Sequence, residues 1–186
     1  PTPGGGSAAA YTGALGAALV AMVARLTVGR KKYANVSNEM VVIVEESERL
    51  RSELTAAVKD DAAAFDIYMQ ALRLPKNTLV EQQTRKEALD KAMLGAAQEP
   101  LKVAQKAVRV LELALEVAAR GNSNAISDAG SAAAHARAAL FAAGLNVRIN
   151  LLDLPDGSIP SAMLSELTAW ELSANSLEKQ VLSVLS

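Results

Sequence analysis

Apolar side chains recur every three or four positions along most of this sequence, and this spacing is typical of helices that bury one face. No period-two run of β-branched residues extends over more than a few positions, so no strand competes with the helical pattern. A chain of 186 residues is long enough for one domain with its own core. The sequence therefore predicts a single all-α domain over residues 1–186, an antiparallel up-and-down bundle of about five long helices.

Proline, glycine and turn residues divide this pattern into segments. Pro75 ends the second helical segment, and Gly121 provides a C-terminal stop for the third. Because a proline inside a helix lacks the backbone N–H donor, a break is expected near Pro100. The Pro-Asp-Gly turn at 155–157 separates the last two helices. The predicted helical segments cover residues 7–26, 38–74, 77–121 with the break, 122–152 and 161–186.

The first 24 residues carry no charge, which raises the question of a membrane segment. Alanine and glycine dominate this stretch, so it is less apolar than a typical membrane-spanning helix. Its positive charges follow the apolar run, whereas in a signal peptide they precede it. Gly13 and Ala17, one helical turn apart, indicate close approach to a neighbouring helix. We therefore expect a buried central helix and no membrane association.

Charge and composition exclude several classes of function. With 19 Lys and Arg against 20 Asp and Glu, the net charge of −1 gives no attraction to nucleic acid. The absence of cysteine excludes disulfides, thiolate zinc sites and a thiol nucleophile, and it fits a cytoplasmic protein. A single histidine, His135, cannot form a multi-histidine metal site, and no carboxylates have EF-hand spacing. No metal is expected, and an ordinary structural role is favoured for His135.

One carboxylate falls on an apolar stripe. Asp61 follows Val58 by three residues and precedes Phe65 by four, so all three share one helix face. Burial of an unpaired carboxylate costs several kcal/mol, so Asp61 must be paired, hydrogen-bonded or protonated. Asp61 is either a reactive acid or base, or a structural residue that lies at a partly exposed edge of the stripe or in an ion pair with arginine. Asp60 faces another way and is the weaker candidate.

Polar residues also share one sector of the predicted helix over 122–152. At 3.6 residues per turn, Asp128, His135 and Asn146 fall in a narrow sector, with Asn124 and Asn150 at its margins. Alanines make up the rest of this face and leave room for a ligand. Alternatively, Asn124 and Asp128 cap the start of the helix.

Three glycines precede the first helix in the segment PTPGGGS, with Ser7 as a candidate N-cap. The unpaired N–H groups at such a helix start can bind an anion or the acceptor edge of a heterocycle. Turn formation alone explains a glycine-rich start equally well.

Three blocks in this order resemble the formimidoyltetrahydrofolate cyclodeaminase family: PTPGGGSAAAYTGALGAALVAMVARLTVGRKKY, DDAAAFDIYMQALRLPK and GNSNAISDAGSAAAHARAALFAAGLNVRINL. The family includes stand-alone bacterial cyclodeaminases, methenyltetrahydrofolate cyclohydrolases and the C-terminal domain of formiminotransferase-cyclodeaminase. The resemblance extends over nearly the whole chain. Family members usually carry a short helix before the first block, and this sequence has neither that helix nor an initiator methionine. A true absence of this helix would alter the dimer and the rim of the site.

The resemblance implies an all-helical homodimer with a folate cleft near the subunit interface. The implied reaction converts 5-formimidoyltetrahydrofolate to 5,10-methenyltetrahydrofolate and ammonia, or hydrolyses the methenyl compound. It needs no cofactor beyond the tetrahydrofolate-derived substrate, and a separate formiminotransferase is an expected partner. A non-catalytic helical dimerisation scaffold is the alternative.

The resemblance also assigns site residues. Asp61 is the first candidate for the acid and base, and Asp128 is the second, because each is an acid within a matching block. Arg30, Lys31 and Lys32 are candidates for the glutamate tail, although cations at a helix C-terminus also complement its dipole. Which aromatic residue stacks on the pterin is left open among Tyr11, Tyr33, Phe65 and Tyr68. The other substrate-binding candidates are Gly4, Gly5, Gly6, Ser7, Asn122, Asn124 and Asn146.

Overall fold

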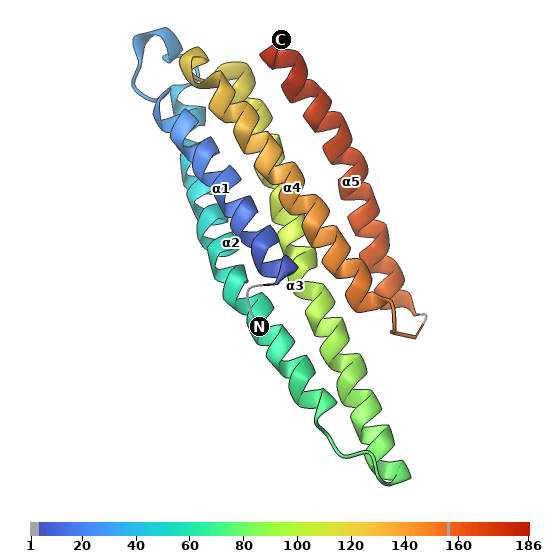
Figure 1. Cartoon of the computed structure of the whole chain (residues 1–186). Coiled ribbons are helices and arrows are strands. Elements are labelled where there is room, and N and C mark those ends of the chain that lie inside the picture. The colour runs from blue at the N-terminus through green and yellow to red at the C-terminus, as the bar shows by residue number, and fades with distance from the viewer. Residues whose placement is uncertain (1–3, 156) are drawn as a thin grey trace.

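The computed structural model describes residues 4–155 and 157–186, which form five α-helices and two short 3-10 helices. Successive α-helices run in opposite directions along one bundle (Figure 1), as predicted from the helical pattern. Of the expected turn at 155–157, Asp156 lies outside the described residues. The elements are α1 (Gly5–Arg25), η1 (Lys31–Tyr33), α2 (Ser37–Leu72), α3 (Leu79–Arg120), η2 (Ser123–Ala125), α4 (Ile126–Leu151) and α5 (Ser158–Leu185).

The ends of α2 and α3 follow from local chemistry. Helix α2 ends at Leu72, ahead of Pro75, and Gly121 caps the end of α3, as predicted. A capping box begins α3: the Thr78 hydroxyl accepts a hydrogen bond from the Glu81 backbone N–H at 3.2 Å, and the Glu81 carboxylate accepts one from the Thr78 N–H at 3.0 Å.

The predicted break near Pro100 is wrong, because α3 is continuous from Leu79 to Arg120 with Pro100 inside it. In a helix, residue 100 would donate its N–H to the carbonyl oxygen of Ala96, and proline has no such donor. The side-chain amide of Asn150 takes over this role, donating from Nδ2 to the Ala96 oxygen at 2.8 Å. A donor from α4 thus satisfies the carbonyl that would otherwise stay unpaired, and α3 continues.

Helix α1 is buried between its neighbours, as predicted from its small residues. Gly16 allows this packing: an added Cβ would lie 3.0 Å from the Ala132 carbonyl oxygen on α4. By length and composition α1 is apolar enough to cross a membrane, but 61% of its most apolar 18-residue window is buried inside the bundle. Its burial is that of a core helix.

Helices α2 and α3, with 36 and 42 residues, are longer than α1 and α4, with 21 and 26 residues. Their joined ends therefore project beyond the other helices, at the lower end of Figure 1. The first turn of α1 lies beside the middle of α2 and the last turns of α4, where this projection starts. This junction is the position of the site described next.

Candidate functional site

The Asp61 carboxylate lies against the first turn of α1. The Ser7 hydroxyl, only 2% exposed as a residue, donates a hydrogen bond to Asp61 Oδ2 at 2.7 Å. Gly6 provides the space for this contact, because an added Cβ would lie 2.0 Å from Asp61 Oδ1. The positive end of the α1 dipole favours a carboxylate at this place. Asp61 is half-buried, which agrees with the predicted position at a partly exposed stripe edge. The predicted ion pair with arginine does not occur among the described residues, and the hydrogen-bond partner of Asp61 is the Ser7 hydroxyl.

Asn146 approaches the same turn of α1 from α4. An added Cβ on Gly5 would lie 3.0 Å from Asn146 Nδ2, a tight contact that would push the amide back by a few tenths of an ångström. Nδ2 donates to the Ala142 carbonyl oxygen at 2.8 Å, which fixes the amide beside α1. Gly5 and Gly6 thus make room for two polar side chains from distant parts of the chain.

A cavity of about 340 Å³ opens in front of these groups, within the size range of small-molecule sites. Its aromatic wall consists of Phe65 and Tyr68 from α2, two of the four aromatic candidates for the pterin. Asp153 adds a second carboxylate to the described lining, which contains neither lysine nor arginine. The cavity is lined by Gly4, Gly5, Gly6, Asp61, Ala64, Phe65, Tyr68, Met93, Ala96, Asn146, Ile149, Asn150 and Asp153.

Ser7 does not cap α1, contrary to the sequence-based expectation. The helix begins at Gly5, its N-cap is Gly4, and no side chain caps it. Ser7 is therefore inside the first turn, where its hydroxyl points to Asp61 instead of to a backbone N–H. We interpret Ser7 as a residue that positions the carboxylate.

The other predicted site residues lie at the opposite end of the bundle. Asp128 is in the first turn of α4, and 18 residues separate it from Asn146, a rise of about 27 Å at 1.5 Å per residue. Arg30, Lys31 and Lys32 follow the end of α1, about 30 Å along this helix from Gly5. Within one chain the structure does not bring any of these residues, nor Asn122 and Asn124, to the cavity with Asp61.

At that opposite end, the side chains mainly join the helix ends to one another. The buried Asn122 donates from Nδ2 to the Leu26 carbonyl oxygen at 3.0 Å, and its Oδ1 accepts from the Asn124 N–H at 3.1 Å. Arg30 donates to the same Leu26 oxygen at 2.7 Å, in keeping with the helix-terminus alternative. The capping alternative for Asn124 and Asp128 is not what the structure shows, since the N-cap of α4 is Ala125 without a side-chain cap.

Tyr33 belongs to this end as well. Its hydroxyl is hydrogen-bonded to the Ser123 side chain at 3.1 Å and accepts from the Ser123 backbone N–H at 2.9 Å. These bonds lower the pKa of Tyr33 to about 8, with a smaller contribution from the neighbouring Lys32 ammonium. Tyr11 is exposed on the outer face of α1, and so only Phe65 and Tyr68 of the four aromatic candidates lie at the cavity.

Met93 and Asp153 line the cavity although neither was predicted from the sequence, and Asn150 was predicted only as a polar residue at the margin of its sector. The Asn150 side chain donates a hydrogen bond to the Ala96 carbonyl oxygen, and both residues line the cavity. The signal in the sequence was Pro100, whose missing donor demands a partner for that carbonyl. Residues 4–155 and 157–186 contain no group of three His, Cys, Asp or Glu side chains placed to hold a metal ion.

Comparison with known proteins identifies the family. The family model described as formiminotransferase-cyclodeaminase matches residues 1–169. The chain belongs to this family. A methenyltetrahydrofolate cyclohydrolase of Methylorubrum extorquens is 44% identical over 181 residues, which are 97% of this chain and 87% of that protein.

Two further members extend the comparison. The formimidoyltransferase-cyclodeaminase of Mus musculus is 38% identical over 154 residues, 83% of this chain but 28% of that larger protein. The crystal structure of a formiminotetrahydrofolate cyclodeaminase from Thermotoga maritima superposes with a TM-score of 0.89 at 32% identity, covering 100% of this chain and 88% of that one. These family members are named as folate one-carbon enzymes, which favours an enzyme over the scaffold alternative.

Proposed function

We propose that this chain is a methenyltetrahydrofolate cyclohydrolase, which opens 5,10-methenyltetrahydrofolate to the 10-formyl compound. One observation carries the proposal: the described lining of the Asp61 cavity has two carboxylates and no lysine or arginine. The substrate is a cation whose charge is shared between N5, N10 and the carbon that joins them. A carboxylate pocket beside an aromatic wall complements such a cation.

Asp61 is the residue proposed to act in the reaction. Water adds to the carbon between N5 and N10, and its proton passes to Asp61 as general base. Asp61 then returns a proton to N5 as the N5–carbon bond breaks, and the water oxygen becomes the formyl oxygen. One water is consumed and one proton is released. Because Ser7 holds Oδ2, the other oxygen, Oδ1, is the one free to exchange the proton.

Cyclodeamination is the second candidate, favoured by the cyclodeaminase with the same fold. N10 of 5-formimidoyltetrahydrofolate attacks the carbon of the protonated amidine, which forms a tetrahedral centre that carries an amino group. Asp61 transfers the N10 proton to this amino group, the carbon–nitrogen bond to it breaks, and ammonia leaves. The product is again the methenyl cation, so the same carboxylates stabilise it. A separate formiminotransferase would then supply the substrate, and we place the reaction in the cytoplasm. No cofactor beyond the folate and no metal enter either reaction as proposed.

Asp61→Asn tests the proposal, with Asp66→Asn as the control, because Asp66 is an exposed aspartate of α2 outside the cavity. The assay follows the decay of methenyl absorbance above the buffer-only rate. We expect acceleration by the wild type and by Asp66→Asn, and loss of at least about 100-fold in Asp61→Asn. Ammonia release from 5-formimidoyltetrahydrofolate is measured in parallel. No acceleration with either substrate would refute both candidate activities.

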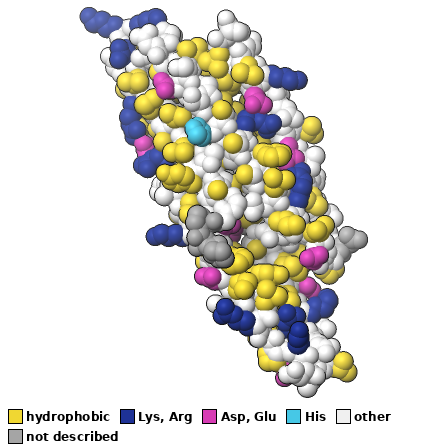
Figure 2. Space-filling model, viewed as in Figure 1, with side chains coloured by type: hydrophobic (Ala, Val, Ile, Leu, Met, Phe, Trp, Pro, Cys, Tyr) yellow, Lys and Arg dark blue, Asp and Glu magenta, His cyan; other side chains and the backbone are white. Residues whose placement is uncertain are grey.

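We further propose a homodimer formed through α1 and α4. Hydrophobic side chains gather over these two helices on the face seen in Figure 2. Phe141, Leu145 and Ile149 follow one another at intervals of four residues on α4 and are 64%, 52% and 62% exposed. Because Ile149 also lines the Asp61 cavity, a second copy on this face would place the site near the interface.

The mass in solution tests this dimer. Light scattering coupled to gel filtration is expected to give twice the chain mass for the wild type. Phe141→Asp is expected to give a monomer, because it places a charge in the apolar face. The control is Leu172→Asp on α5, where an equally exposed leucine lies on another helix. A wild-type monomer, or a dimer that survives Phe141→Asp, would contradict the proposed interface.

A further inference from the structure

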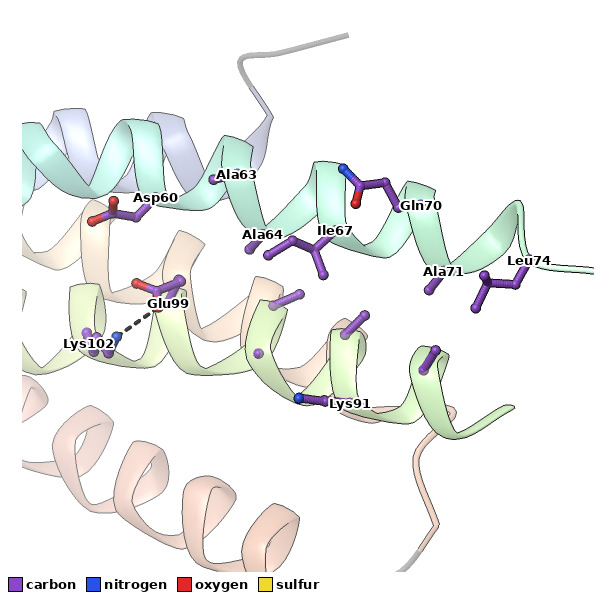
Figure 3. A pocket seen from close by; sticks show the side chains of 14 residues that line it. Asp60, Ala63, Ala64, Ile67, Gln70, Ala71, Leu74, Lys91, Glu99 and Lys102 are labelled. Carbon is purple, nitrogen blue, oxygen red and sulfur yellow. Dashed lines mark hydrogen bonds and ion pairs between the residues drawn. The ribbon is translucent and has the colours of Figure 1, made fainter. Parts of the chain in front are cut away.

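A second cavity, of about 760 Å³, lies between the projecting parts of α2 and α3. Figure 3 shows its wall, which is formed mainly by small and apolar side chains of the two helices. It meets the Asp61 cavity at Ala64 and Ala96, which line both. The apolar part of its lining includes Ala63, Ile67 and Ala71 from α2 and Ala88, Ala92 and Gly95 from α3.

Charged groups divide this cavity into two ends. Asp60, Glu99 and Lys102 lie at one end, where Lys102 Nζ pairs with Glu99 Oε1 at 2.8 Å. Lys91 lies toward the other end, five residues before Ala96 and thus about 7.5 Å along α3 from the junction. No ion pair of Lys91 occurs within residues 4–155 and 157–186, and its side chain is exposed. Lys91 is therefore the cation in this cavity that is available to an anion.

The proposed substrate needs such a second compartment, so this inference rests on the proposed function. A folate carries a p-aminobenzoyl ring and a glutamate beyond its pterin, and the Asp61 cavity has no described cation for the two glutamate carboxylates. Arg30, Lys31 and Lys32, first expected to bind this tail, lie about 30 Å away along α1, farther than an extended monoglutamyl folate reaches.

We propose that the cavity between α2 and α3 binds the p-aminobenzoylglutamate part of the folate, with Lys91 binding a glutamate carboxylate. The pterin and the reacting carbon then lie beside Asp61, and N10 lies at the junction formed by Ala64 and Ala96. The aminobenzoyl ring packs on the apolar wall, and the tail points away from Asp60 and Glu99, whose charges repel it. Lys91 contributes binding that is equal in the ground and transition states, so it affects KM and leaves kcat unchanged.

The test compares two substrates, 5,10-methenyltetrahydrofolate and 5,10-methenyltetrahydropteroate, which lacks the glutamate. Lys91→Met is expected to raise KM for the folate up to about fivefold, with kcat retained and with no change for the pteroate. Lys86→Met is the control, because Lys86 is an exposed lysine of α3 outside the cavity. A second variant, Gly95→Leu, fills the cavity where an added Cβ meets no atom within 4 Å, and it is expected to weaken binding of the folate.

A binding measurement separates this inference from the proposed activity. Calorimetry gives dissociation constants of the wild type and of Lys91→Met for tetrahydrofolate and tetrahydropteroate, whether or not turnover occurs. Tighter binding of tetrahydrofolate by the wild type, lost in Lys91→Met, supports the tail site even if both reactions are absent. Equal affinities for the two ligands, or an unchanged preference in Lys91→Met, would overturn it while leaving the role of Asp61 intact.

Discussion

Replacing Gly6 by alanine tests whether the contact between α1 and Asp61 sets the position of the reacting carboxylate. The new Cβ would lie 2.0 Å from Asp61 Oδ1, 2.7 Å from Cγ and 3.0 Å from Oδ2. Real Cβ atoms essentially never approach another atom below 3.0 Å, so Oδ1 must move by about 1 Å. The backbone of α1 is held by its packing on α2 and α4, and the carboxylate is the group that moves.

The expected effect on the rate is much larger than the effect on folding. A displacement of about 1 Å at a reacting group costs about 100-fold in rate. Movement of Asp61 also weakens its hydrogen bond with Ser7, and a bond to a charged group contributes about 1.5–3 kcal/mol. Alanine in place of glycine regains up to about 1 kcal/mol of helix propensity. Gly6→Ala should therefore be folded, less stable by about 1–2 kcal/mol, and about 100-fold slower.

The methenyl absorbance assay and urea unfolding measure the two effects separately. Gly130→Ala is the matched control, because its added Cβ would lie 2.7 Å from Leu185 Cδ1, a flexible atom away from the cavity. This control should lose some stability and keep its activity. Wild-type activity in Gly6→Ala, or an equal loss of activity in Gly130→Ala, would refute the reasoning about Asp61.

Three further predictions concern stability and titration. Asn150→Ala should lower the free energy of unfolding by about 1–3 kcal/mol, because the Ala96 carbonyl loses its donor. In a Pro100→Ala background the same substitution should cost much less, because the Ala96 carbonyl regains a backbone donor. Urea unfolding of the two single variants and the double variant measures this difference. Glu46→Gln should cost about 1 kcal/mol at pH 7, because Glu46 forms a bidentate pair with Arg109 at 2.8 Å. Because Arg109 lowers the pKa of Glu46 in the folded protein, this stabilisation is fully present above the pKa that Glu46 has in the unfolded chain. It disappears as the pH falls through the pKa of Glu46 in the folded protein. Urea unfolding of the wild type and of Glu46→Gln at a series of pH values measures this loss. Tyr33→Phe should remove an ionisation with a pKa of about 8 from the ultraviolet titration of the folded protein; a titration unchanged by the substitution would contradict it.

The helices were predictable because their boundaries depend on neighbours in sequence. Pro75 and Gly121 favour the ends of α2 and α3 through their own backbone chemistry, without a contribution from distant residues. Pro100 was misjudged because its effect depends on Asn150, 50 residues later, which provides the donor that the helix lacks. Local rules describe what a proline removes, whereas only the packed structure shows what replaces it.

For the candidate site, the sequence predicts the direction in which a side chain points from its helix, but not its height, by which we mean its position along the bundle axis. A helical wheel predicts the direction of each side chain, and it correctly placed Asp61 on the face that meets another helix. The same wheel put Asp128 and Asn146 in one sector, yet they are about 27 Å apart along α4. Height along the bundle depends on where α1 begins relative to α2 and α4, and this is fixed by packing between segments more than 50 residues apart. Gly5 and Gly6 mark this height, because Asn146 and Asp61 approach the α1 backbone there in the space that the two missing side chains leave, so the glycine pair lies at the site within the bundle.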